Sequence, residues 1–367
     1  MVPINVANRL LTWETTYQTN AGLDLGFFNN RLTTSLDLYR KQTEDLLQRM
    51  PLAPSDGYDF ILANIGSLEN KGFEINLNVD IIKNDNVKWN VYGNYSMFRN
   101  KITKLGITPS QWGDQTLVAF QGNQISGGNY FKTFANIYAE GLPMGSFFGY
   151  ETNGIITTPE QLAVAGTING IAPQLGDVFI VDQNDDGLIT DVDKTVIGDP
   201  NPNFTYGFGS TLEYKNFNLS LAFNGVYGND IANGNLARED YADGTTQNIR
   251  AAAYYDAWNA TTNPNGTRPR VNYDLNDDLG FTDRMLEDGS FLRLQYVSLG
   301  YKIPLSSKSI FSSADISIAG NNLLLFTKYS GYDPEVSSFS GDPFRTGLDW
   351  MSFPNQRSYS INLNLTF

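Results

Sequence analysis

Strict alternation between apolar and polar residues is the feature that most constrains how this chain can fold. In the last segment, apolar side chains occupy every second position from Tyr359 to Phe367, and serine, asparagine and threonine lie between them. The same two-residue period runs from Phe73 to Ile81 and returns from Phe217 to Phe223. Successive side chains of a β-strand point to opposite faces of the sheet, so each segment predicts a strand with one apolar and one polar face.

This pattern predicts about eleven strands. They cover residues 12–27, 31–48, 65–82, 87–101, 130–140, 145–156, 203–214, 217–229, 288–302, 313–327 and 356–367. Tight connections at 28–30, 83–86, 141–145, 215–216 and 304–312 alternate with long ones at 49–64, 102–129, 157–202, 230–287 and 328–355.

An alternation of short and long connections is typical of outer-membrane barrels, in which periplasmic turns are short and extracellular loops are long. A soluble β-sandwich buries its apolar faces against each other and needs no such asymmetry. The sequence therefore predicts an all-β protein, an antiparallel transmembrane β-barrel. An odd number of strands cannot close such a barrel, so we expect further strands upstream of Met1.

Composition narrows the function. The net charge of −14 would repel a phosphate backbone, which argues against a nucleic-acid partner. The chain has neither histidine nor cysteine, which excludes imidazole and thiol catalysis and metal sites built from those ligands. No run of 18 apolar residues predicts a membrane-spanning helix. The first residues lack the features of a secretory signal, so we expect a fragment of an exported protein.

Two local features add detail. Aromatic residues near predicted strand ends suggest an interfacial girdle, although ordinary enrichment in strands explains any single one equally well. These residues are Trp13, Phe27, Tyr39, Trp89, Tyr214, Phe217 and Tyr301. Residues 249–258 have helical composition within a long connection and predict a short helix there.

One motif carries a defined chemistry. Asp182, Asn184 and Asp186 occupy positions 1, 3 and 5 of a twelve-residue loop that resembles an EF-hand-type calcium loop, with a glycine at position 6. The carbonyl of Leu188 would serve position 7, and Asp193 stands at position 12. Asp193 replaces the usual glutamate and should bind more weakly. The two interpretations are a structural calcium site and an acidic surface turn that binds nothing.

Several ordered segments together resemble the SusC/RagA-type TonB-dependent transporters of the outer membrane. The most recognisable is Asn64–Glu74, and the matches span most of the chain. The others are Trp13–Arg31, Asp37–Leu47, Gly145–Tyr150, Gly176–Asp177, Val196–Gly207, Asp288–Gln295, Gly320–Leu323 and Lys328–Glu335. The terminal Phe367 is similar to the C-terminal aromatic residue that the barrel-insertion machinery reads.

The resemblance implies that residues 1–367 form the C-terminal part of the barrel, about eleven of 22 strands, without the N-terminal plug domain or TonB box. It implies active import of glycans or peptides across the outer membrane. It also implies two partners, a SusD-like surface lipoprotein and TonB, with the membrane lipid around the barrel.

Other functions stay open at this stage. A passive porin or a surface adhesin would use the same barrel. A secreted carbohydrate-active enzyme with a β fold needs only a pair of carboxylates, and chance pairs are expected among 39 acidic residues. We predict a protein that is not an enzyme.

Overall fold

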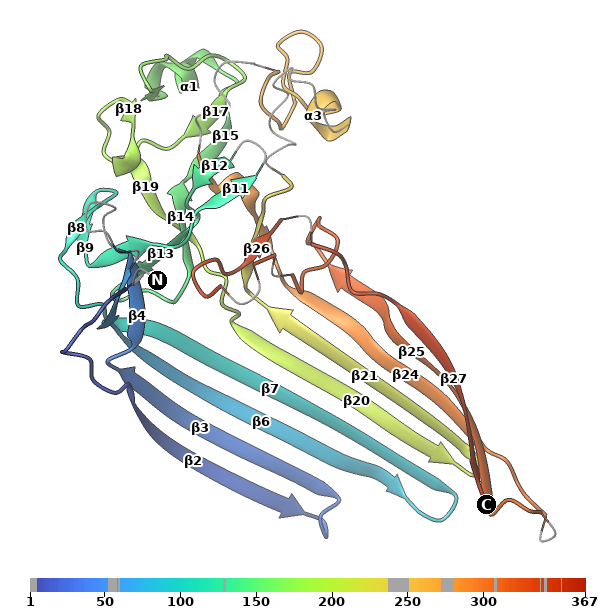
Figure 1. Cartoon of the computed structure of the whole chain (residues 1–367). Helices are drawn as coiled ribbons and strands as arrows, with labels where there is room; N and C mark the ends of the chain where they lie inside the picture. The colour runs from blue at the N-terminus through green and yellow to red at the C-terminus, as the bar shows by residue number, and fades with distance from the viewer. Residues whose placement is uncertain are drawn as a thin grey trace.

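A computed structural model describes residues 5–51, 58, 60–127, 130–236, 251–271, 280–306, 309–336, 338–339, 342–350 and 352–367. Its main feature is an antiparallel sheet in the strand order β2-β3-β6-β7-β20-β21-β24-β25-β27, nine strands in all. These are β2 (Thr15–Phe27), β3 (Leu32–Glu44), β6 (Ser67–Lys83), β7 (Val87–Lys104), β20 (Phe204–Tyr214), β21 (Phe217–Tyr227), β24 (Phe291–Lys302), β25 (Ser313–Thr327) and β27 (Ser358–Thr366). Every neighbouring pair is antiparallel, and the strands lie side by side along the sheet (Figure 1).

Tight and long connections alternate along this sheet, as the sequence predicts. Figure 1 shows the tight turns and the C-terminus together at the lower end of the strands, with the long connections folded above the upper end. Lys215 occupies the left-handed region in the turn between β20 and β21, with φ 55°. Antiparallel neighbours joined by two residues require such a conformation.

The predicted strands at 130–140 and 145–156 are wrong as members of the main sheet. Both lie within the long connection between β7 and β20, where β13 (Asn136–Ala139) and β14 (Ser146–Tyr150) belong to a separate small sheet. Both strands are buried along their whole length. They are also only four and five residues long, whereas a strand needs about 9–11 residues to cross a bilayer. Because these two predicted strands form a hairpin, leaving both of them out of the main sheet does not change the alternation of tight and long connections.

The long connections fold into a compact layer of small sheets. One sheet has the order β10-β13-β14-β19, with β10 (Ala119–Gln121) and β19 (Lys194–Gly198) at its edges. A second has the order β23-β22-β26 and joins two long connections through β22 (Asp230–Asn233), β23 (Leu286–Asp288) and β26 (Leu348–Asp349). We call this folded assembly of the long connections the loop layer.

The remaining elements are short, and all of them belong to the loop layer except β1, which precedes β2 and pairs with β5. They are β1 (Asn5–Val6), β4 (Leu47–Pro51), β5 (Phe60–Asn64), β8 (Ser110–Trp112), β9 (Gln115–Leu117), β11 (Ile125–Gly127), β12 (Tyr130–Thr133), β15 (Thr152–Ile155), β16 (Thr167–Ile168), β17 (Val178–Ile180) and β18 (Leu188–Ile189), with the helices α1 (Pro159–Val164), η2 (Asp191–Asp193), α3 (Ala251–Tyr255) and η3 (Asp283–Met285). Helix α3 confirms the predicted helix over Ala251–Tyr255, whereas residues 256–258 lie beyond its end and Ile249 and Arg250 lie outside the described residues. Within the described part of the chain, no helix is long and apolar enough to cross a membrane.

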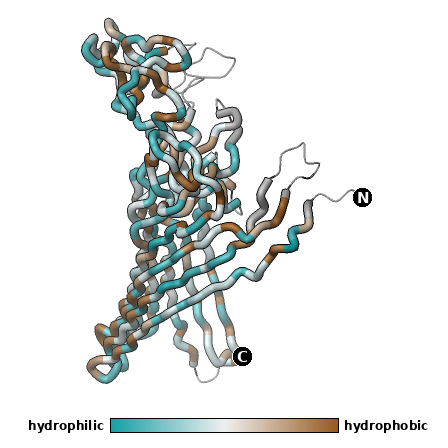
Figure 2. Tube along the Cα trace, turned by 90° about the vertical axis from the view of Figure 1, so that its left-hand side faces the viewer, coloured by the Kyte–Doolittle hydropathy of each residue, from teal (hydrophilic) through white to brown (hydrophobic). Residues whose placement is uncertain are grey.

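The buried core lies in the loop layer and not beneath the sheet. Phe147, Trp258, Phe281 and Leu348 come from three different long connections and share one cluster of buried side chains. The long connections therefore stabilise one another through an apolar core of their own. Figure 2 shows the contrast from the side, with the strands of the sheet extended below the folded connections.

Candidate functional site

The register of the sheet separates polar from apolar side chains onto opposite faces. Asp24, Ser35, Asn76 and Asn94 are partners in one row across β2, β3, β6 and β7, and the row continues through Gly207, Asn224 and Arg293. One position along, Leu23, Leu36, Ile75 and Tyr95 form the corresponding row on the other face. Since side chains alternate along each strand, the sheet has a polar face and an apolar face over its length.

The apolar face is exposed to the surroundings. Leu23, Ile318 and Ile361 leave 53%, 54% and 76% of their surfaces uncovered. In water this would expose a large apolar area, whereas a lipid bilayer is its natural surrounding. The apolar face is therefore the lipid-facing side of the sheet.

Aromatic residues form a band on the apolar face at the end of the sheet that carries the tight turns. Tyr214, Phe217 and Tyr301 are register partners there, and the rings of Phe217 and Tyr301 lie 4.7 Å apart. Phe27 and Trp89 lie on the same face. Tyr39 is an exception to the predicted girdle, because it lies on the polar face against Gly72 of the neighbouring strand. Trp13 precedes β2 at the opposite end.

The polar face holds a groove of about 970 Å³. Its lining extends across β2, β3, β6, β7, β20 and β21 and includes the polar side chains of Asp24, Thr33, Ser35, Asn76, Asn78 and Asn94. Hydroxyl, amide and carboxylate groups of this kind can hydrogen-bond water or a polar solute. This face has the character of a wet lumen.

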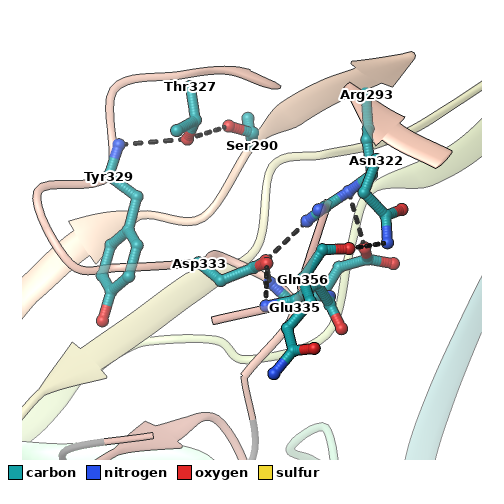
Figure 3. A network of polar contacts seen from close by, with 9 residues as sticks. Ser290, Arg293, Asn322, Thr327, Tyr329, Asp333, Glu335 and Gln356 are labelled. Atoms are coloured by element: carbon teal, nitrogen blue, oxygen red, sulfur yellow. Dashed lines mark hydrogen bonds and ion pairs between the residues drawn. The ribbon is translucent and has the colours of Figure 1, made fainter. Parts of the chain in front are cut away.

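A buried ionic cluster fixes the connection between β25 and β27 to the top of the sheet (Figure 3). Arg293 of β24 is 4% exposed, and its Nη2 lies 2.5 Å from Oδ1 of Asp333 while its Nε lies 3.0 Å from Oε2 of Glu335. The second oxygen of Asp333 accepts the backbone N–H of Asn355 at 3.1 Å. Nearby, the hydroxyl of Tyr329 donates to the buried carboxylate of Asp349. The cluster therefore holds both ends of the connection.

Protonation of the cluster follows from its surroundings. Burial raises the pKa of the Asp333 carboxyl. The hydrogen bond from Arg293, those from the backbone N–H groups of Glu335 and Asn355, and the charge of Arg293 together outweigh burial and hold that pKa below its ordinary value. Burial raises the pKa of Glu335 more than Arg293 lowers it. Burial, followed by the hydrogen bond to Asp349, raises the pKa of the Tyr329 hydroxyl. Asp333 is thus the charged partner of Arg293, and Tyr329 remains a hydrogen-bond donor.

The predicted calcium residues occupy one exposed loop between β17 and η2. Oδ2 of Asp182 accepts the backbone N–H of Gly187 at 2.7 Å, and Nδ2 of Asn184 donates to Oδ2 of Asp186 at 3.0 Å. Leu188 begins β18, with half of its surface exposed. Positions 1, 3 and 5 of the motif are therefore neighbours around the turn.

Asp193, at position 12, is completely buried in η2. Its two oxygens accept the backbone N–H groups of Gln183 at 3.0 Å and of Thr190 at 2.7 Å. Among the described residues, no group of three or more Asp, Glu, His or Cys side chains is arranged so that it could hold a metal ion. The calcium site stays a prediction.

Sequence reasoning assigned no role to Arg293, Asp333 or Tyr329. All three lie in segments that resemble the transporter family, but a single arginine in a strand gives no signal of which distant carboxylate it meets. The register of β21 and β24 places Arg293 beside Asn224 on the polar face, and only the folded structure shows that Asp333 is its partner.

The long antiparallel sheet, its lipid-facing side and its wet side together define part of an outer-membrane β-barrel. The family model described as "TonB dependent receptor-like, beta-barrel" matches residues 2–153. TonB-dependent receptor P3 of Formosa agariphila is 35% identical over 100% of the chain, and TonB-dependent receptor SusC of Bacteroides thetaiotaomicron is 27% identical over 98%. The chain belongs to the TonB-dependent receptors and is a SusC/RagA-like outer-membrane protein.

A solved structure described as the RagAB peptide transporter has the same fold. Its TM-score is 0.77 at 24% identity, and the match covers 99% of this chain and 36% of that chain. This chain spans 35% of the length of receptor P3 and 32% of the length of SusC. The relatives are named as receptors and transporters, and the lack of an enzymatic activity stays a prediction.

The two faces can be tested with neighbouring residues of β6. We expect Leu77→Lys to reduce folding stability in lipid vesicles by about 2–4 kcal/mol, because its side chain faces the hydrocarbon. Asn76→Lys adds the same charge on the polar face and should cost far less. The measurement is the denaturant midpoint, in vesicles, of the barrel expressed with its upstream sequence, and equal losses for the two variants would contradict the assignment of the faces.

The ionic cluster yields a second prediction. Arg293→Met leaves the Asp333 carboxylate buried without its cation and should destabilise the connection at 328–357 by about 3–5 kcal/mol. Arg345→Met removes a more exposed ion pair in the same connection and should cost only about 1 kcal/mol or less. Protease cleavage within this connection, followed in detergent, measures both changes, and cleavage at the same rate in both variants would argue against the cluster as its anchor.

The same cluster should also respond to pH. The pKa of Asp333 is lower in the folded than in the unfolded protein, so its stabilising contribution is present above about pH 4 and is lost as the pH falls through the folded value. Asp333→Asn should remove this part of the acid sensitivity. An unchanged acid profile for the variant would show that Asp333 is not the group that titrates.

Proposed function

We propose that this chain is the C-terminal part of the barrel of an active importer of peptides or glycans. In this proposal a plug domain fills the lumen, TonB supplies energy from the inner membrane, and a SusD-like surface lipoprotein closes over the loop layer. The observation that carries the proposal is the sheet itself, which has one lipid-facing side, one polar side and two open edges.

The open edges support the view that more strands complete the barrel. β2 and β27 are the two end strands of the described sheet and pair with a neighbour on one side only. Unpaired backbone N–H and C=O groups in lipid cost several kcal/mol each, so a sheet of this kind is stable in a bilayer only when further strands close it.

The polar groove and the loop layer support transport of a polar solute. The groove presents amide and hydroxyl groups along the lumen side, and such groups exchange hydrogen bonds with sugars or peptide backbones at little net cost. The buried core of the loop layer gives a partner lipoprotein a surface with a fixed shape. The relatives named as a peptide transporter and as SusC support the same class of activity.

Import is the direct test. Cells that express the chain together with its upstream sequence should take up labelled oligopeptides or oligosaccharides, and deletion of TonB should abolish the uptake. The chain expressed without its upstream sequence should neither insert as a heat-modifiable barrel nor support uptake. Uptake that is independent of TonB would favour a passive porin, and a stable soluble monomer would favour a secreted protein.

We further propose that the loop with Asp182, Asn184 and Asp186 binds a calcium ion that rigidifies the connection between β17 and β19. The carbonyl of Leu188 and the carboxylate of Asp193 complete the proposed ligand set. What supports this is that the first three side chains already surround one turn, and that Asp193 ties the end of the loop back to Gln183 near its start. A cation would offset the repulsion between these carboxylates.

Calcium should therefore raise the unfolding temperature of the loop layer in the wild-type protein. Asp182→Ala and Asp186→Ala should abolish this shift. Asp185→Asn is the matched control, because Asp185 lies in the same turn in the left-handed region that asparagine tolerates, and it occupies no ligand position. The proposal fails if calcium leaves the wild-type unfolding temperature unchanged.

A further inference from the structure

A row of basic residues crosses the apolar face at the end of the sheet that carries the long connections. Arg40, Lys71 and Arg99 are register partners on β3, β6 and β7. Two residues further down the same strands, Leu38, Phe73 and Met97 form the next row on this face. The cations thus point to the same side as the lipid-facing residues, immediately above them.

Most of this positive charge is available to a ligand. The side chains of Arg40 and Lys71 are each 64% exposed, and both share one carboxylate, that of Glu69, at 2.5 Å and 3.9 Å. The guanidinium group of Arg99 donates to the carbonyls of Pro202 and Asn203 and to the side chain of Asn203, so these contacts do not neutralise its charge.

The next row toward the loop layer adds one more exposed cation, Lys101, opposite Glu69. Glu44 is the other acidic residue at this end of the face, and it accepts a hydrogen bond from Gln42. Four cations therefore face two carboxylates here, although the whole chain carries a net charge of −14. A local excess of positive charge in an acidic protein points to an anionic partner.

An apolar groove lies directly beneath the basic row. It measures about 550 Å³, and Thr19, Ala21, Leu38, Phe73 and Met97 line it together with the three cations. The groove is open toward the side on which the bilayer lies. Cations above an apolar groove match a molecule with an anionic head and a hydrocarbon tail.

We propose that this site binds a phosphorylated lipid of the outer leaflet. Its phosphate would bind Arg40, Lys71 and Arg99, and one acyl chain would lie in the groove. Arginine and lysine are the usual phosphate-binding side chains, and basic pockets at the membrane boundary bind anionic lipid head groups. The inference rests on the proposed orientation, in which the long connections are extracellular and the basic row therefore lies at the outer leaflet.

The experiment uses the barrel expressed with its upstream sequence and reconstituted into phosphatidylcholine vesicles that contain a minor fraction of a bis-phosphorylated glycolipid. The glycolipid that remains with the protein after mild detergent extraction is measured by native mass spectrometry. The double variant Arg40→Gln with Lys71→Gln should reduce retention roughly tenfold or more. The binding free energy that two cations contribute at an anionic lipid surface is at least as large as the free energy that corresponds to a tenfold loss.

The matched control removes two positive charges from the polar face. Lys41 and Lys88 lie on that face, Lys41 adjacent to Arg40 in sequence, and Lys41→Gln with Lys88→Gln should leave retention unchanged. Ala21→Phe fills the groove and keeps the cations, so it should weaken glycolipid retention. Competition by inorganic phosphate at the concentration of the glycolipid would show a simple anion site and overturn the proposal.

Equal retention of the glycolipid by the wild-type protein and the Arg40/Lys71 variant would also overturn the proposal. The cations would then extend to the interface only to be solvated by water. The outcome is separable from that of the import test. If the barrel inserts and retains the glycolipid but imports nothing, the lipid-site proposal is supported and the import proposal fails. If the barrel imports but does not retain the glycolipid, only the lipid-site proposal fails.

Discussion

The pairing of backbone N–H and C=O groups is the constraint on which the rest of this structure depends. Within a bilayer no water replaces a missing partner, so each strand must be hydrogen-bonded along its full length. The ladder between β2 and β3 pairs every residue from Thr15 to Phe27. The ladder between β6 and β7 extends from Ser67 to Lys83 with only two shifts of register. The long strands and the tight turns at one end both follow from this requirement.

Side chains pack differently in the main sheet and in the loop layer. A single sheet in lipid cannot bury its apolar face against a second layer, so its strands pack sideways. Tyr39 lies against Gly72, and Tyr92 lies against Gly209, each on a neighbouring strand. A Cβ atom at either glycine would come within 2.4 Å of the tyrosine ring, so only glycine permits this close contact. The loop layer, which is exposed to water, buries Phe147 and its neighbours as a soluble domain does.

This difference explains which parts of the fold could be predicted from sequence. The period of two from Phe73 to Ile81 predicts β6 because one face meets lipid and the other meets water along its whole length. The strand predicted at 145–156 is wrong as a member of the main sheet. Because β14 is buried on both faces, its short apolar run shows no alternation, and nothing in the sequence distinguishes it from a membrane-spanning strand. The pairing of Arg293 with Asp333 links residues 40 positions apart across a connection whose path no local pattern specifies.

The distribution of charge follows from the same separation of lipid from water. Arg293 and Asp333 are nearly fully buried, and each neutralises the other, so their cluster fixes a connection without exposing charge. Lys88 and Glu213 form an exposed pair on the polar face, where water solvates both. On the apolar face, by contrast, the cations Arg40, Lys71 and Arg99 gather in one row at its upper boundary. A charge on that face is tolerated only near the head groups, and a positive charge there gains most from the phosphates of the surrounding lipid.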